Sequence, residues 1–335
     1  MKQRIAFVDL AKGICILLIV FNHAFGKTAG SALESLMIFR MPLYFVLSGL
    51  FFKSYGNLFN FVKKKVNKLL IPMFLAFIFL SIPSTFILNI HEGVPITITN
   101  LFLMPSEPHK LNFGLSPSSW FLLCLFILNV IFYFVFLLSK KNIYVILFIS
   151  FLCGLGGYYC NVQSIILPIW IDTALTSVPF FCVGYIIRNS TNFLDDIISL
   201  KYSLILICSA LLLIFCISLI GDGDDILYAG NHYDVNPLCL YLGGISGTLC
   251  ILIIAKYINY LPVISYVGRY SIVLLLTHQF YLFIIRNILY QIKVPQDTAW
   301  TSLVVFIIVV IVSLPTIKYG IKYLPYCFAQ KEFFR

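Results

Sequence analysis

Charged side chains are scarce in this chain of 335 residues: Asp, Glu, Lys and Arg make up 11% of it, and only 13 residues are acidic. Hydrophobic residues make up 61%. This composition excludes an ordinary soluble domain, in which charged residues make up about 25%. Apolar runs recur along the whole length, and each is long enough for a helix that crosses a bilayer, which needs about 20 residues.

Cysteine spacing gives no sign of a disulfide framework or a metal site. The ten cysteines are scattered, with no Cys-x-x-Cys pair and no ligand-like spacing to histidine. We interpret them as small packing residues, and we expect no metal cofactor. The formal charge of +10 reflects membrane topology rather than a nucleic-acid partner.

The apolar runs predict an all-α polytopic membrane protein with about ten transmembrane helices, in one integral-membrane domain over residues 1–335. Helices are expected because each satisfies its own backbone hydrogen bonds in lipid. The predicted spans are residues 7–26, 33–52, 70–89, 119–139, 142–160, 172–188, 203–220, 238–255, 270–289 and 300–317.

The distribution of Lys and Arg orients these spans. With the N-terminus in the cytoplasm, 18 of the 23 basic residues lie in segments on the cytoplasmic side of the membrane. Five basic residues lie towards the outer side of the membrane: Lys27, Arg40, Lys110, Arg286 and Lys293. The positive-inside rule therefore predicts that both termini are cytoplasmic, and the expected location is a plasma membrane, the inner membrane of a bacterium.

The first span contains two ionisable residues, Lys12 and His23, eleven residues apart. At 100° per residue their side chains lie within roughly 20° of one helix face, separated by roughly 16 Å along the axis. Ionisable residues inside a span are energetically costly and face a polar site or pathway within the protein. This pair is the first candidate for the chemistry.

Residues 53–69 are basic and partly amphipathic. One interpretation is a surface helix on anionic lipid headgroups. The other is a phosphate-binding cluster, since Lys65 and Lys68 share one helix face. On the predicted outer side, the acidic stretch 221–237 is expected to be a solvated loop, with an acceptor-sugar site as the alternative.

Several segments match known motifs. They are Arg4-Ile-Ala-Phe-Val-Asp9-Leu-Ala-Lys12-Gly13 followed by His23, Arg40-Met-Pro-Leu-Tyr-Phe-Val-Leu-Ser48-Gly49, Lys65-Val-Asn-Lys68-Leu-Leu-Ile-Pro72, Trp120-Phe121, Pro179-Phe-Phe-x-x-Gly184, and Tyr266-x-Gly268-x-Tyr-Ser271 ahead of His278. Together they resemble the membrane acyltransferase-3 family, whose members are multi-spanning O-acyltransferases that modify cell-surface carbohydrates. The family's two arginines before Leu and Pro are replaced here by Lys65 and Lys68, which keep the charge and lose bidentate geometry.

The resemblance implies transfer of an acyl group, most simply acetyl from acetyl-CoA, to a hydroxyl of a cell-envelope glycan or a lipid-linked sugar precursor. A sugar hydroxyl needs a base, and a neutral imidazole suits that task, so His23 is the expected general base. Alternatively, its ring nitrogen takes the acyl group and passes it on. Arg40 either steadies the developing oxyanion or extends to the headgroups.

The donor is expected at the cytoplasmic face, where Lys12, Lys65 and Lys68 would bind its phosphates as point charges. Candidate substrate-binding residues are Glu34, Trp120 and His278. Trp120 could equally be an interfacial aromatic residue, and His278 a helix-packing residue. The rival function is a transporter or flippase, in which Lys12, His23, Arg40 and His278 line a polar path.

Overall fold

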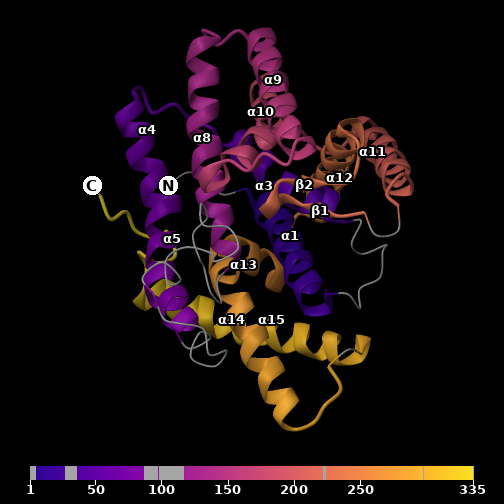
Figure 1. Cartoon of the computed structure of the whole chain (residues 1–335). Helices are drawn as coiled ribbons and strands as arrows, with labels where there is room; N and C mark the ends of the chain where they lie inside the picture. Colours follow the sequence, from indigo (N-terminus) through magenta and orange to yellow (C-terminus); the bar gives the residue numbers. More distant parts are fainter. Residues whose placement is uncertain are drawn as a thin grey trace.

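The computed structural model is almost entirely helical (Figure 1), and it describes residues 5–26, 36–86, 97, 117–221, 224–296 and 298–334. Within these ranges, nine helices are long and apolar enough to cross a membrane. A tenth apolar helix, α3 (Met37–Leu50), has only 14 residues. The prediction of an all-α polytopic membrane protein is confirmed.

Most helices lie within a few residues of the predicted spans. They are α1 (Ala6–Phe25), α8 (Trp120–Leu138), α9 (Ile143–Val162), α10 (Ile171–Ser190), α11 (Leu200–Ser218), α12 (Pro237–Ile258), α14 (Ser271–Gln291) and α15 (Ala299–Tyr323). A short helix, α13 (Pro262–Arg269), precedes α14. The apolar runs predict these positions well because a helix must be apolar over its whole length to cross the bilayer.

The third predicted span begins earlier than expected. Helical structure runs without interruption from α4 (Leu58–Lys65) through a π-helical turn (Val66–Leu70) into α5 (Ile71–Ala76) and a second π-helical turn (Phe77–Ser81), and it ends at Phe86. The basic segment is therefore continuous with the span rather than a separate surface helix. Such π-turns are rare and occur frequently at functional sites.

Polar side chains cap the N-termini of several helices. Asn142 accepts hydrogen bonds from the backbone N–H groups of residues 144 and 145, and Asn236 accepts one from Cys239, just before Pro237 at the first helical position. Thr298 accepts from Thr301 at the start of α15. Each cap satisfies a backbone donor that the helix leaves unpaired.

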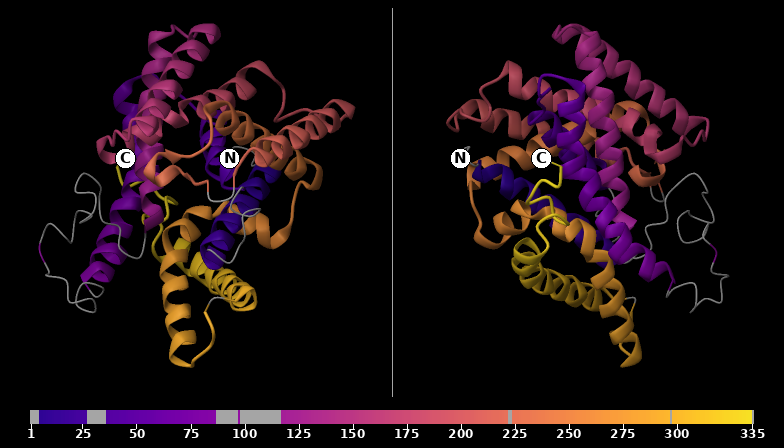
Figure 2. Two further views of the ribbon diagram at one scale, coloured as in Figure 1. Left: turned by 45° about the vertical axis from the view of Figure 1, so that its right-hand side comes forward. Right: turned by 90° about the vertical axis from the view of Figure 1, so that its left-hand side faces the viewer.

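The most enclosed helices are α10 and α12, whereas α9 and α11 expose most of their apolar side chains. In Figures 1 and 2, α9 stands beside α10 and α11 beside α12, so the exposed pair covers the outside of the bundle. Side chains such as Phe148 (62% exposed) and Leu211 (63% exposed) are those expected to face lipid.

Two close helix crossings depend on glycine. A Cβ atom on Gly49 of α3 would overlap the carbonyl oxygen of Phe181, and one on Gly184 of α10 would overlap that of Val46. At the second crossing, Gly13 of α1 and Gly268 of α13 approach each other in the same way. These four glycines belong to the motifs quoted above, so those motifs serve helix contact as well as chemistry.

The only strands in the described part of the chain form a short antiparallel hairpin, β1 (Ile226–Leu227) and β2 (His232–Tyr233), in which Ile226 pairs with Tyr233. It lies in the acidic stretch that was expected to be a solvated loop. That expectation is wrong for this part, because Ile226, Tyr228 and Tyr233 are buried against the helices. The apolar residues inside the polar stretch are the sequence signal for this burial.

Candidate active site

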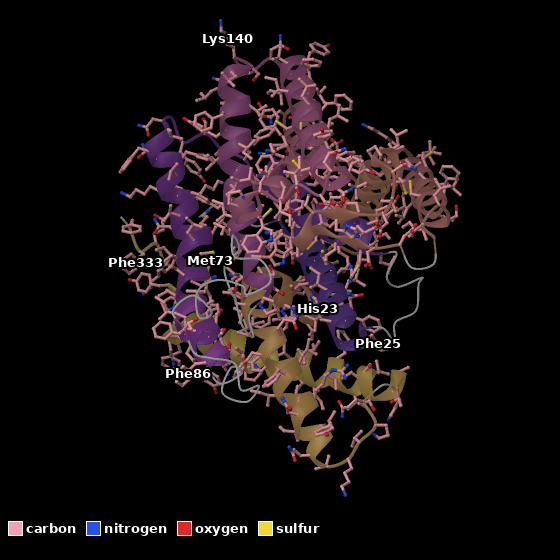
Figure 3. All side chains as sticks on the ribbon, in the orientation of Figure 1. His23, Phe25, Met73, Phe86, Lys140 and Phe333 are labelled. Atoms are coloured by element: carbon pink, nitrogen blue, oxygen red, sulfur yellow. The ribbon has the colours of Figure 1, made fainter. Side chains whose placement is uncertain are left out.

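Two histidines from distant parts of the chain meet at the end of α1. His23 lies in the last turn of α1, and Figure 3 shows it near the lower end of that helix, towards the middle of the molecule. His278, in α14, is fully buried. The two ring centroids are 5.3 Å apart, with the planes inclined by 35°. His23 is the accessible member of the pair.

The hydrogen bonds of His278 define which nitrogen carries its proton. Nδ1 lies 2.6 Å from the carbonyl oxygen of Leu274, which can only accept, so Nδ1 is the donor. In the neutral ring Nε2 then keeps a lone pair, and it faces the hydroxyl of Ser118 at 3.4 Å. The carbonyl of Leu274 thus fixes the tautomer of the neutral ring, with its acceptor nitrogen towards Ser118.

His23 opens onto a cavity of about 110 Å³, here called the histidine cavity. Its lining residues are Ile19, Asn22, His23, Met37, Arg40, Met41, Ser118, Trp120, Phe121, Ile226, Leu227, Tyr228, Ala229 and Leu275. Three of the predicted site residues therefore share one cavity, namely His23, Arg40 and Trp120. His278 lies directly behind it, in contact with His23 and Ser118.

Arg40 is held in place by the first helix. It is 5% exposed, and its Nη1 donates to the carbonyl of Leu18 at 3.2 Å. The thiol of Cys15 donates to the backbone carbonyl of Arg40 at 2.9 Å. Since the side chain is buried and lines the histidine cavity, it does not extend to the headgroups.

The β1–β2 hairpin supplies one wall of the histidine cavity, through residues 226–229, which the sequence did not predict. Tyr228 donates to the carbonyl of Ile38 at 3.3 Å, and Thr173 of α10 donates to the carbonyl of Tyr228 at 2.9 Å. The indole N–H of Trp170 donates to the carbonyl of Ala229 at 2.7 Å. These bonds tie the hairpin to α3 and α10.

A second pocket, of about 290 Å³, brings together the three predicted donor-binding lysines; it is here called the lysine pocket. Its lining residues are Lys12, Tyr44, Leu47, Ser48, Phe51, Tyr55, Lys65, Lys68, Leu69, Phe121, Leu122, Leu125, Ser271, Ile272 and Leu275. Tyr44 also donates to the backbone carbonyl of Lys12 at 3.2 Å, which links α3 to α1. The three lysines come from α1, from the end of α4 and from the first π-helical turn.

Phe121 and Leu275 line both the histidine cavity and the lysine pocket. Both side chains are buried, at 4% and 8% exposed. The two chambers therefore lie back to back, with these residues between them. This arrangement agrees with the axial separation of roughly 16 Å predicted for Lys12 and His23 along α1.

Ser48 lines the lysine pocket and accepts a hydrogen bond from Asn129 at 3.2 Å, beside the crossing at Gly49. Glu34 lies outside the described residues. All ten cysteines are described, and none is in a disulfide. Among the described residues, no three His, Cys, Asp or Glu side chains gather closely enough to hold a metal ion.

The fold and site together define a multi-pass membrane protein with two neighbouring chambers, one lined by His23 and Arg40 and the other by three lysines. The acyltransferase domain of the acyltransferase-3 family (Acyl_transf_3) matches residues 5–318. The chain therefore belongs to this family, and the predicted resemblance is confirmed. Comparison with curated proteins and with solved structures gives no match.

Proposed function

We propose that this protein transfers an acyl group, acetyl in the first instance, from acyl-CoA to a hydroxyl of a cell-envelope glycan or its lipid-linked precursor. The observation that carries the proposal is the pair of chambers that share Phe121 and Leu275, with three lysines in one and His23 in the other. Family membership favours acyl transfer over the transporter alternative.

In this proposal the phosphates of the donor bind in the lysine pocket. Lys12, Lys65 and Lys68 act as point charges towards phosphate oxygens, and the pocket is bounded by apolar side chains that suit the rest of the donor. The pantetheine arm then passes Phe121 and Leu275, so that the thioester reaches the histidine cavity. The positive-inside orientation places the lysine pocket towards the cytoplasm, where acyl-CoA is made.

The acceptor hydroxyl enters the histidine cavity beside His23. The imidazole takes the hydroxyl proton as the oxygen attacks the thioester carbon, and the C–S bond then breaks as the imidazolium gives that proton to the departing sulfur of CoA. Arg40 is buried and charged, so it can stabilise the oxyanion that develops on the carbonyl oxygen. His278, held by the carbonyl of Leu274, packs against His23 and keeps its ring in place.

The acceptor would contact Trp120 and the hairpin, since these line the same cavity. Aromatic rings suit the apolar faces of sugars, and the backbone of residues 226–229 adds hydrogen-bonding groups. A cavity of about 110 Å³ suits a small acyl group at the reacting end, which supports acetyl over longer chains. The location proposed with this function is the bacterial inner membrane.

The experiment uses the full chain in nanodiscs with acetyl-CoA and a cell-envelope extract as acceptor, and follows the release of free CoA. We expect His23→Ala to lower turnover by roughly 10²–10⁴, the range typical of a general acid–base group. Lys12→Ala should raise the KM for acetyl-CoA. Size-exclusion chromatography checks that each variant is folded. Undiminished turnover in folded His23→Ala would contradict the assignment of the base.

A second readout separates the base from the acyl-histidine alternative. Protein incubated with radiolabelled acetyl-CoA and no acceptor is quenched and counted for bound label. A general base predicts no label on the protein, because transfer is direct. Label that depends on His23 would identify an acyl-enzyme intermediate instead.

A further inference from the structure

A third cavity lies on the other side of α14, and neither chamber of the proposed reaction includes it. Its volume is about 550 Å³, which is within the range of pockets that enclose small-molecule ligands. α5, α14, α15 and the C-terminal segment form its walls. In Figures 1 and 2 the yellow C-terminal segment runs from α15 up beside α5 and α4.

The residues that line this cavity are mostly apolar. Two threonines line it, and both hydroxyls are bonded within their own helices: Thr277 donates to Val273 at 2.8 Å, and Thr316 donates to Val312 at 2.9 Å. Polar groups whose hydrogen bonds are satisfied do not favour a polar ligand over an apolar one. The chemistry of the walls therefore favours a hydrocarbon occupant.

The cavity opens where side chains are exposed in the membrane-spanning part of the chain. Phe79 is 66% exposed and Tyr319 is 54% exposed, and both line the cavity. In a bilayer, an apolar cavity with such an opening is in contact with lipid chains. The bilayer around the protein can thus supply a lipid chain to fill the cavity.

Two lysines mark the predicted cytoplasmic end of α15 beside this opening. Nζ of Lys318 lies 5.9 Å from the ring of Tyr319, and Nζ of Lys322 lies 5.0 Å from the ring of Tyr323. Both rings line the cavity. No carboxylate in the described ranges forms a salt bridge with either lysine, so their charge is available to an anionic headgroup.

The wall formed by the C-terminal segment is firmly held. Phe328 is 7% exposed and packs on Gly320. Further on, Asn67 in the first π-helical turn bonds three backbone groups of Phe333 and Phe334, at 2.8–2.9 Å, and Lys64 pairs with Glu332 at 2.7 Å. Most of this wall lies beyond residue 318, where the family match ends.

We propose that this cavity binds one chain of an anionic phospholipid from the cytoplasmic leaflet, with the phosphate held by Lys318 and Lys322. The inference stands apart from the proposed reaction, since none of these residues lines either chamber. Bound lipid would fill the space between α5, α14 and α15 and support the turn of α14 that precedes His278.

The test is native mass spectrometry of the full chain in detergent, titrated with phosphatidylglycerol or phosphatidylcholine of the same chain length. We expect one phosphatidylglycerol bound per protein, with phosphatidylcholine at least about tenfold weaker. Lys318→Gln with Lys322→Gln should weaken phosphatidylglycerol binding by about tenfold or more. The control, Lys140→Gln with Lys141→Gln at another predicted cytoplasmic turn, should leave binding unchanged.

Ala76→Trp tests the chain-binding part, because Ala76 lines the cavity and is 6% exposed. It should lower binding of both lipids, while Leu155→Trp on the exposed side of α9 should not. Equal binding of the two lipids, or binding unaffected by the lysine and Ala76 variants alike, would overturn the proposal. Co-purification of a polyprenyl phosphate in place of phospholipid would overturn it too, and would assign the cavity to a lipid-linked acceptor.

Discussion

The rings of His23 and His278 lie 5.3 Å apart between centroids, although the residues are about 250 positions apart in the sequence. His278 is locked by its own helix, because Nδ1 donates to Leu274. His23 is accessible from the histidine cavity. We therefore propose that His23 reacts and His278 holds it, and this division leads to the first prediction.

His278→Phe should lower kcat/KM by about tenfold to a hundredfold while leaving the fold intact. Phenylalanine keeps the ring that packs on His23, and it removes the acceptor nitrogen that faces Ser118. It also removes the donor Nδ1 that bonds Leu274. Leaving a buried polar group unpaired costs about 1–3 kcal/mol, which corresponds to this range. The measurement is steady-state CoA release, with thermal unfolding as the stability control. Unchanged kinetics would assign His278 to packing alone.

Lys65→Ala and Lys68→Ala should each raise the KM for acyl-CoA by roughly tenfold with little change in kcat. A hydrogen bond to a charged group contributes about 1.5–3 kcal/mol, and these lysines would contact the donor before the chemical step. Lys64→Ala is the matched control, because Lys64 pairs with Glu332 and does not line the lysine pocket. A similar rise in KM for Lys64→Ala would point to general surface charge instead.

Leu275→Ala should remove part of the wall between the chambers and improve the use of longer acyl donors. We expect the ratio of kcat/KM for butyryl-CoA to that for acetyl-CoA to rise by about tenfold, within the 1–3 kcal/mol typical of methylene discrimination. Leu122→Ala removes the same volume from a residue that lines only the lysine pocket. An equal change in both variants would mean that Leu275 does not separate the chambers.

Gly184→Ala should destabilise the protein by about 1–3 kcal/mol, because its Cβ would overlap the backbone of α3 at Val46. The control is Gly156→Ala in α9, where a Cβ meets nothing within 4 Å. Alanine there should leave stability unchanged or raise it by up to about 1 kcal/mol. Thermal unfolding in the same detergent compares the two. If both variants were equally stable, α3 and α10 would be able to move apart without a loss in the free energy of unfolding.

The sequence predicts the geometry of the candidate site where the information is local. The spacing of Lys12 and His23 on one helix, and of Lys65 and Lys68 on the next basic segment, follows from helical geometry alone. The structure adds that Lys12, Lys65 and Lys68 share one pocket, which helical spacing could not decide. It also adds the hairpin wall at Tyr228 and the shared residues Phe121 and Leu275.

The sequence by itself determined the class of fold and the positions of the helices, because a bilayer demands a long unbroken apolar run for every span. It also placed Lys12 and His23 on one face of the first helix. Only the tertiary structure decided that His278 meets His23, that a polar loop closes the histidine cavity, and that the C-terminal segment walls a third cavity. Those contacts join residues far apart in the chain, and they depend on which helices pack together. A local pattern of hydrophobicity does not predict which helices those are.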